Sequence, residues 1–405
     1  MRNLKNVMFN IGGTSIYYFV QLVISILIAK LLGFQSAGVN SLALTISNAI
    51  YPIALYGARG FQVSDINDKF SEGDYTYMRI ATTTAAILIF AVSLYLMKLS
   101  EITIWCAIAY MTARVFESFS DLFFGFFQKK EKYNFIFFSY IYKTIAVSVF
   151  FAIAIMVTKN IFIVITTATV AFIAMFTAYD LRKTLPLVTL KIGPANLVIL
   201  LKKCWPLMLF SFIPPYINFI VRYFVEIIYG TEILGYYSSI AIFQSVVVML
   251  TSSIWVVYIP MFSKLHFERD TEQIRRMIVK NLLGTILVSA IAVVVSIYLG
   301  APVLTLLYGP KILAYNFLLL QTVIISAIGS IVMLFNTVLI STGRNDIMLA
   351  ANALGAVVIT ACAYPLIGKF GVGGANYAMF AGILLQALLV AGITFVATKN
   401  DHYGH

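Results

Sequence analysis

The sequence is poor in charged residues, and its shortages exclude several classes of protein. Only 11% of its 405 residues are charged, whereas 61% are hydrophobic; a typical soluble domain is about a quarter charged and about half apolar. Cysteine is scarce as well, because Cys106, Cys204 and Cys362 stand far apart and form no CxxC pattern. We interpret them as small buried residues. Neither a soluble globular domain nor a disulfide framework fits this chain.

Motifs for catalysis and cofactor binding are also lacking. The sequence contains no GxSxG, P-loop, HExxH or GxGxxG pattern. Its three histidines, His266, His402 and His405, lie outside the hydrophobic segments. We therefore expect no enzymatic activity, no cofactor and no metal site.

Long hydrophobic runs dominate what is present. An α-helix needs about 20 apolar residues to cross a bilayer, and runs of this kind recur along the whole chain. We count twelve: 11–32, 38–58, 79–98, 102–127, 133–157, 160–179, 204–229, 234–260, 278–299, 313–341, 346–368 and 372–397. No segment between them is long enough for a separate soluble domain. The sequence predicts an all-α polytopic membrane protein with 12 transmembrane helices.

The net charge of +12 follows from where the basic residues lie. With the N-terminus inside, 20 of the 28 Lys and Arg residues fall in inner segments and five in outer segments. This bias obeys the positive-inside rule and predicts that both termini are cytoplasmic. It leaves no reason to expect a nucleic-acid partner.

A basic connection divides the runs into two halves. We predict an N-terminal six-helix bundle over 1–179, a cytoplasmic linker over 180–203, and a C-terminal six-helix bundle over 204–405 that ends in a short cytoplasmic tail. Similar glycine-containing turns open both halves, at 33–38 and 230–235. Since each half has an even number of runs, both halves share one orientation, which predicts a pseudo-two-fold axis along the membrane normal. Glycine turns are also common in unrelated helical hairpins.

Six ionisable residues fall inside the hydrophobic runs. A charge at membrane depth costs several kcal/mol unless it faces a partner or a wet cavity. They are Arg114, Glu117, Asp121, Lys143, Arg222 and Glu226.

The spacing of these charges predicts pairs. Arg114, Glu117 and Asp121 share one face of a helix, and Arg222 and Glu226 stand one turn apart. Lys143 is expected to meet Glu117 at one depth, because a short turn joins their runs. Two interpretations stay open. The pairs either hold helices together, or they line a hydrated cavity whose cations meet an anionic substrate and whose carboxylates exchange protons or cations.

Two adjacent prolines, Pro214 and Pro215, lie in the middle of a run shortly before Arg222. Each proline removes a backbone donor and clashes with the preceding turn, so a kink or break is expected there. This site is either a hinge or a static kink.

Several short motifs resemble one family. Asn10-Ile11-Gly12-Gly13 opens the first run and Leu31-Leu32-Gly33 closes it. The stretch from Tyr56 to Asp65 (YGARGFQVSD) follows the second run, and Ile259 to Lys264 (IPMFSK) follows the eighth. These features resemble the polysaccharide-transport branch of the MOP flippase superfamily, and the second stretch looks like Wzx-type O-antigen flippases.

The resemblance implies a protein of the bacterial cytoplasmic (inner) membrane that serves lipopolysaccharide biosynthesis. Its substrate would be an undecaprenyl-pyrophosphate-linked oligosaccharide, flipped by alternating access with H+ or Na+ as a coupling ion. Membrane lipids and other polysaccharide-assembly membrane proteins would be its partners. In this interpretation Arg59, Arg114, Lys143 and Arg222 bind substrate, while Glu117, Asp121 and Glu226 balance them or carry the ion.

Two other functions remain as alternatives. A cation-coupled multidrug exporter of the same superfamily would favour carboxylates over cations, whereas this chain has as many cations inside its runs. A membrane-embedded glycan polymerase generally needs a large outer loop with catalytic side chains, and the sequence has none.

Overall fold

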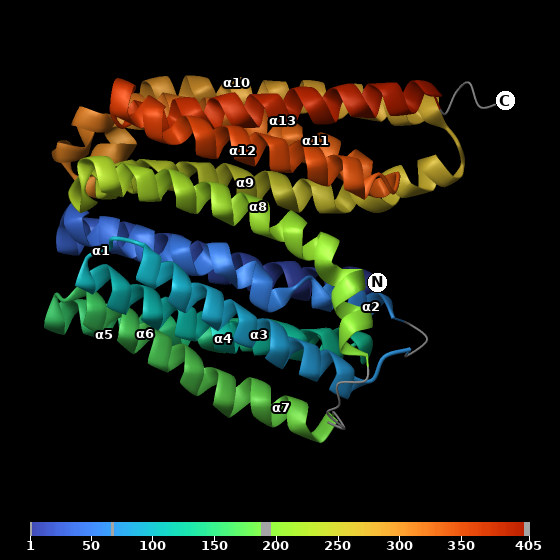
Figure 1. The fold of residues 1–405 in the computed structure, drawn as a ribbon, viewed down its shortest axis with the longest axis horizontal. Coiled ribbons are helices and arrows are strands. Elements are labelled where there is room, and N and C mark those ends of the chain that lie inside the picture. The colour runs from blue at the N-terminus through green and yellow to red at the C-terminus, as the bar shows by residue number, and fades with distance from the viewer. Residues whose placement is uncertain (1, 66–68, 188–195, 401–405) are drawn as a thin grey trace. The chain divides into compact units, whose positions relative to one another are not determined.

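A computed structural model describes residues 2–65, 69–187 and 196–400 of the chain (Figure 1). Within these ranges every regular element is a helix. The all-α fold expected from the hydrophobic runs is therefore confirmed. The helices group into two compact units, Met1–Phe219 and Ile220–His405.

The first unit contains the helices that precede α8 and the part of α8 up to Phe219. The helices before α8 are α1 Arg2–Leu55, α2 Ala58–Ser64, α3 Glu72–Leu96, α4 Glu101–Lys129, α5 Tyr133–Thr158, α6 Ile161–Met175 and α7 Arg182–Thr184. A π-helix, Phe176–Leu181, continues α6, and a 3-10 turn, Leu185–Leu187, follows α7. α1 packs against α3, α4 and α5, whereas α6 packs against α4 and α5. These contacts make α1 the central helix of the unit.

The second unit begins within α8, Leu197–Tyr229. Its other helices are α9 Thr231–Phe267, α10 Thr271–Tyr308, α11 Phe317–Ser341, α12 Asn345–Phe370 and α13 Gly373–Asn400, with a 3-10 helix at Pro310–Tyr315. α11 packs against α9, α10 and α13, and α12 packs against α13. A hydrogen bond between two buried amide side chains links α12 to α11: Asn352 on α12 donates to Asn336 on α11 over 3.1 Å.

Nine of the described segments are long and apolar enough to cross a membrane. The first, Gly12–Ser64, holds two of the predicted runs, because Gly33 leaves helical geometry (φ 85°, ψ 172°) and breaks α1 there. α4, which carries Arg114, Glu117 and Asp121, is not among the nine. The chain is a multi-pass membrane protein. The number twelve stays a prediction.

The predicted linker at 180–203 is largely helical where the structure describes it. Residues 180–187 continue the helical path of α6, and α8 begins at Leu197. The boundary between the compact units lies further along, inside α8. The predicted domain limits and the pseudo-two-fold axis stay predictions.

α8 contains three prolines, Pro206, Pro214 and Pro215, and runs through them as one helix. The amide of Asn218 donates to the Pro214 carbonyl over 3.0 Å, which adds a side-chain bond to the backbone beside the proline pair. The expected break is therefore not seen as an interruption of the helix. The hinge stays a prediction.

A close helix contact positions α2. Gly57, which precedes α2, has a positive φ of 66°, a conformation that glycine adopts without strain. A Cβ atom at Gly57 would lie 2.5 Å from the Cβ atom of Leu207 on α8. The backbone before α2 thus lies so close to α8 that only glycine fits at position 57.

Candidate functional site

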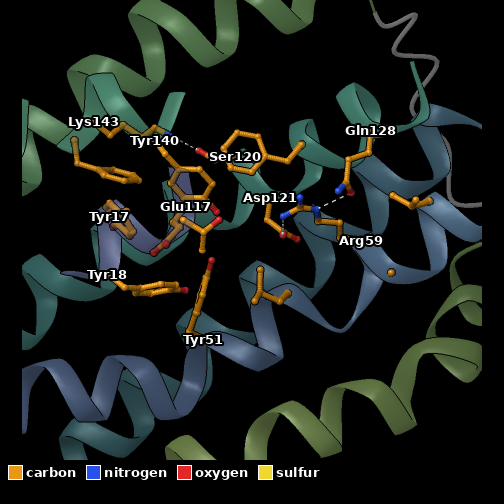
Figure 2. A pocket seen from close by; sticks show the side chains of 16 residues that line it. Tyr17, Tyr18, Tyr51, Arg59, Glu117, Ser120, Asp121, Gln128, Tyr140 and Lys143 are labelled. Atoms are coloured by element: carbon orange, nitrogen blue, oxygen red, sulfur yellow. Dashed lines mark hydrogen bonds and ion pairs between the residues drawn. The ribbon is translucent and has the colours of Figure 1, made fainter. Parts of the chain in front are cut away.

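A cavity of about 530 Å³ lies within the first unit, where α1, α2, α4, α5 and α6 meet (Figure 2). Its polar lining comes from segments far apart in the sequence. The polar residues are Thr14, Tyr17, Tyr18, Tyr51, Arg59, Glu117, Ser120, Asp121, Gln128, Tyr140 and Lys143. Three of the four predicted substrate-binding cations belong to the first unit, and two of them, Arg59 and Lys143, line this cavity.

Arg114 and Glu117 form the ion pair that their spacing predicts. Both side chains are largely buried, and the guanidinium carbon of Arg114 lies 5.2 Å from the centre of the Tyr51 ring. Arg114 lines a second, smaller cavity of about 80 Å³, and Glu117 lines both cavities. Tyr17 and Phe172 also line both cavities, so the two cavities adjoin at these three residues.

Lys143 has a different partner from the one that sequence suggests. Its ammonium group forms an ion pair with Asp180 and donates to the Ser120 hydroxyl over 2.7 Å. Ser120 in turn donates to the same Asp180 oxygen over 2.8 Å. Lys143 and Glu117 line the same cavity, but the ion-pair partner of Glu117 is Arg114. The meeting of Lys143 with Glu117 at one depth of the membrane stays a prediction.

Asp180 was missed because it follows the sixth hydrophobic run and was counted as the first residue of the linker. It lies in the π-helix after α6 and is fully buried. π-Helical turns are rare and frequently occur at functional sites. Lys143 itself could have indicated a further carboxylate. It is a cation inside a hydrophobic run, and Glu117, the carboxylate expected near it, was already predicted to pair with Arg114.

Asp121 binds two arginines at once. Its Oδ1 atom lies 3.3 Å from Arg59 on α2, and its Oδ2 atom lies 2.9 Å from Arg79 on α3. Arg59 also donates to Gln128 over 3.1 Å. Arg79 is fully buried, although it was not among the ionisable residues predicted inside the hydrophobic runs. The shared helix face predicted for Asp121 and Arg114 holds, but the partners of Asp121 come from other helices.

The charges of this cluster do not cancel. Three carboxylates each hold one deeply buried cation: Glu117 holds Arg114, Asp180 holds Lys143, and Asp121 holds Arg79. Arg59 is the additional cation among the residues that the structure describes here, and about a fifth of its side chain is exposed. The cluster therefore carries one net positive charge, where the sequence had suggested balance.

Tyrosines and phenylalanines form the rest of the wall. Tyr17 and Tyr140 pack with ring centres 5.6 Å apart, and Figure 2 shows Tyr18 and Tyr51 close to Glu117. The Phe124 ring lies 5.5 Å from the Arg59 guanidinium carbon. Tyrosine combines an apolar ring with a hydroxyl group that donates and accepts. The cavity thus offers both hydrogen bonds and flat apolar surfaces to a ligand.

Residues 3–266 match the sequence model of a family described as polysaccharide biosynthesis protein. The chain belongs to this family. It is similar to the capsular polysaccharide biosynthesis protein CapF of Staphylococcus aureus, with 22% identity over 390 residues that cover 94% of this chain and 93% of CapF.

Solved structures show the fold of this polysaccharide biosynthesis family member. An inward-facing multidrug resistance MATE family transporter of the MOP superfamily superposes with a TM-score of 0.77 at 11% identity, covering 96% of each chain. A MOP superfamily transporter from Pyrococcus furiosus, described as having a binding pocket of reverse polarity, gives a TM-score of 0.63 at 11% identity, covering 97% of this chain and 93% of its own. The expected fold of the MOP superfamily is confirmed, because this chain shares its fold with these transporters.

The remaining predicted site residues lie on α8. Arg222 and Glu226 belong to the second unit and are half-buried. Glu226 accepts a hydrogen bond from Thr231 over 2.7 Å. Pairing of Arg222 with Glu226, and a shared cleft with the first-unit cluster, stay predictions. In the described parts of the chain, no three His, Cys, Asp or Glu side chains converge as a metal site.

Proposed function

We propose that this protein flips an undecaprenyl-pyrophosphate-linked oligosaccharide from the cytoplasmic to the periplasmic leaflet of a bacterial cytoplasmic membrane. Movement would proceed by alternating access, with both termini in the cytoplasm. The family match and the similarity to CapF support a polysaccharide precursor as the cargo. An O-antigen or capsular repeat unit belongs to this class.

The observation that carries the proposal is the makeup of the cavity in the first unit. Its cluster has a cation in excess of its carboxylates, and this cation, Arg59, is also the most exposed of the four. A guanidinium group matches the geometry of a phosphate, which it binds through two parallel hydrogen bonds. The tyrosine-lined wall suits the hydroxyl-rich rings of a glycan. A diphosphate-linked sugar therefore meets a complementary surface.

The other predicted residues receive roles that follow from their surroundings. Lys143 lines the same cavity and adds to its positive potential, and Arg114 does so from the smaller cavity beside it. Arg222 would offer a cation in the second unit. Glu117 and Glu226 would carry H+ or Na+ if transport is coupled, and Asp121 would balance charge. Pro214 and Pro215 would allow α8 to bend during the cycle.

Reconstitution tests the proposal directly. Purified full-length protein in liposomes should move a fluorescent lipid-linked oligosaccharide between leaflets. Arg59→Gln should slow flipping by about tenfold or more, because one charged contact to the substrate contributes about 1.5–3 kcal/mol. Arg114→Ala should also slow it, because it removes positive charge from the smaller cavity beside the site. Arg222→Ala tests the second unit in the same assay.

Arg276→Gln is the matched control. Arg276 forms an exposed ion pair with Glu272 in the second unit, so its loss should leave the rate near that of the wild type. Flipping at the wild-type rate by folded Arg59→Gln and Arg114→Ala would refute the cationic-cavity proposal. Transport that ignores pH, sodium and membrane potential would remove the coupling role of Glu117 and Glu226.

A cation-coupled multidrug exporter is the second candidate, because several solved structures of this fold are MATE transporters. A cationic drug would meet net positive charge in the first-unit cavity, which disfavours its binding there. Efflux of cationic dyes from cells that express the protein, without flipping of lipid-linked oligosaccharide, would favour the exporter. A membrane-embedded glycan polymerase has less support, since the sequence contains none of the catalytic motifs sought.

A further inference from the structure

The carboxylate of Asp121 is shared unequally between its two arginines. Arg79 lies 2.9 Å from Oδ2 and is completely buried, whereas Arg59 lies 3.3 Å from Oδ1 and is partly exposed on the wall of the cavity. The shorter contact thus belongs to the residue that solvent does not reach. Figure 2 shows the Arg59 side of this arrangement, with Asp121 and Gln128 on either side of the guanidinium group.

Further bonds hold Arg79 in place. Its Nη1 atom donates to the carbonyl of Ala54 over 2.8 Å, in the last turn of α1. Thr82 donates to the same carbonyl over 2.9 Å. A cation at the C-terminal end of a helix is also favoured by the helix dipole. Arg79 is therefore anchored to two helices, and its position does not depend on Arg59.

Arg59 has weaker restraints. Its second hydrogen bond goes to the neutral amide of Gln128, and it extends from α2, a helix of only seven residues. The Phe124 ring beside its guanidinium group favours a cation without fixing its direction. Arg59 can leave Asp121 by rotation of its own side chain.

The cost of that departure depends on Arg79. A carboxylate left without a cation in a site with little water is strongly destabilised. Asp121 keeps Arg79 when Arg59 leaves, so its charge stays compensated. Because Arg79 stays bound to the Asp121 carboxylate, Arg59 can be exchanged.

We propose that Arg59 exchanges between Asp121 and a phosphate-type anion of the substrate, and that Arg79 is the positioning residue that makes this exchange possible. The inference rests on the proposed function, because it takes the first-unit cavity as the place where the diphosphate enters. In the structure described here, Asp121 and Gln128 hold Arg59. In the loaded cavity its two outer nitrogen atoms face the diphosphate, while the Asp121–Arg79 pair remains.

Binding of inorganic pyrophosphate to purified full-length protein, measured by calorimetry, tests the exchange. Asp121→Asn should bind roughly threefold more tightly than the wild type, because Arg59 no longer has to leave a partly exposed ion pair. Arg79→Gln should bind roughly tenfold more weakly, because Asp121 then depends on Arg59 alone. The double variant Arg79→Gln/Asp121→Asn should regain the affinity of Asp121→Asn.

The conservative variant and a second background separate this role from a structural one. Arg79→Lys keeps a cation beside Asp121 and should bind within about twofold of the wild type. In an Arg59→Gln background, Asp121→Asn should bring no gain, whereas a general effect of removing a negative charge would persist there. Thermal unfolding and size-exclusion profiles accompany each variant. Arg79→Gln and Asp121→Asn each leave a buried charge without its partner. If either does not fold, the double variant Arg79→Gln/Asp121→Asn, in which neither charge remains, is compared with and without Arg59→Gln and decides the exchange.

Two results overturn the inference: Asp121→Asn binds pyrophosphate no more tightly than the wild type, or its gain survives without Arg59. Failure of the proposed function looks different. In that case the wild type binds pyrophosphate through Arg59, but it moves no lipid-linked oligosaccharide in liposomes.

Discussion

At the scale of single residues, the buried charges differ in the number of oppositely charged partners that they contact. Lys143 and Asp180 are both almost completely buried, and Ser120 bridges them. Three phenylalanine rings also surround the Lys143 ammonium group, with the Phe172 ring centre 4.8 Å away. Among the residues that the structure describes, neither member of this pair has a second ion-pair partner, whereas Asp121 has two arginines.

Removing one member of the Lys143–Asp180 pair should therefore destabilise the protein strongly. Lys143→Ala is expected to cost about 3–5 kcal/mol, because it leaves a buried carboxylate without its cation. The double variant Lys143→Met/Asp180→Leu should be more stable than Lys143→Ala, since no charge stays buried. Thermal unfolding in detergent measures the difference. A double variant less stable than Lys143→Ala would contradict this account of the pair.

At the scale of secondary-structure elements, the short helix α2 connects the cavity with α8. Its residue Arg59 lines the cavity, and Gly57 immediately before it contacts α8. Lys203 on α8 lies 5.5 Å from the centre of the Phe61 ring on α2 and 5.3 Å from that of Phe70. The position of Arg59 thus depends on how α2 packs against α8.

Gly57→Ala should disturb this packing. The new methyl group would lie 2.5 Å from the Leu207 Cβ atom, and the positive φ adds backbone strain of about 1–2 kcal/mol. We expect a lower melting temperature and slower flipping, because α2 and Arg59 must shift. Gly329→Ala on α11 is the matched control, since open space surrounds that position. Equal behaviour of the two variants would show that the contact with Leu207 does not position α2.

At the scale of the whole molecule, the distribution of charge predicts the orientation in the membrane. Basic residues concentrate in the segments predicted to lie on the same side of the membrane as the N-terminus. Positive charge near the ends of spans favours a cytoplasmic location for such segments. The predicted twelve spans, an even number, would then return the C-terminus to the same side. The orientation follows from sequence, because insertion responds to local charge rather than to packing.

Reporter fusions test this orientation. An enzyme that is active only outside the cytoplasm should be inactive when fused after His405 and active when inserted after Gly309, which precedes the tenth hydrophobic run. A reporter active only in the cytoplasm should give the opposite pattern. Activity of the external reporter at His405 would place the C-terminus outside and contradict the even number of spans.

The sequence by itself determined the features that depend on local composition. Hydrophobic runs of bilayer length identify an all-α membrane protein, and three-residue spacing identifies the Arg114–Glu117 pair, because both signals reside within one helix. The short motifs around Tyr56 to Asp65 were enough to indicate the family that the comparisons show.

Only the tertiary structure decided which charges meet across helices. Asp121 takes its arginines from α2 and α3, and Lys143 takes its carboxylate from the π-helix after α6. These three ion pairs join residues 37 to 62 positions apart, a separation over which helix periodicity carries no information. A buried charge needs an opposite charge close to it. The packing of the helices determines which residue can supply that charge, and packing is not visible in the sequence.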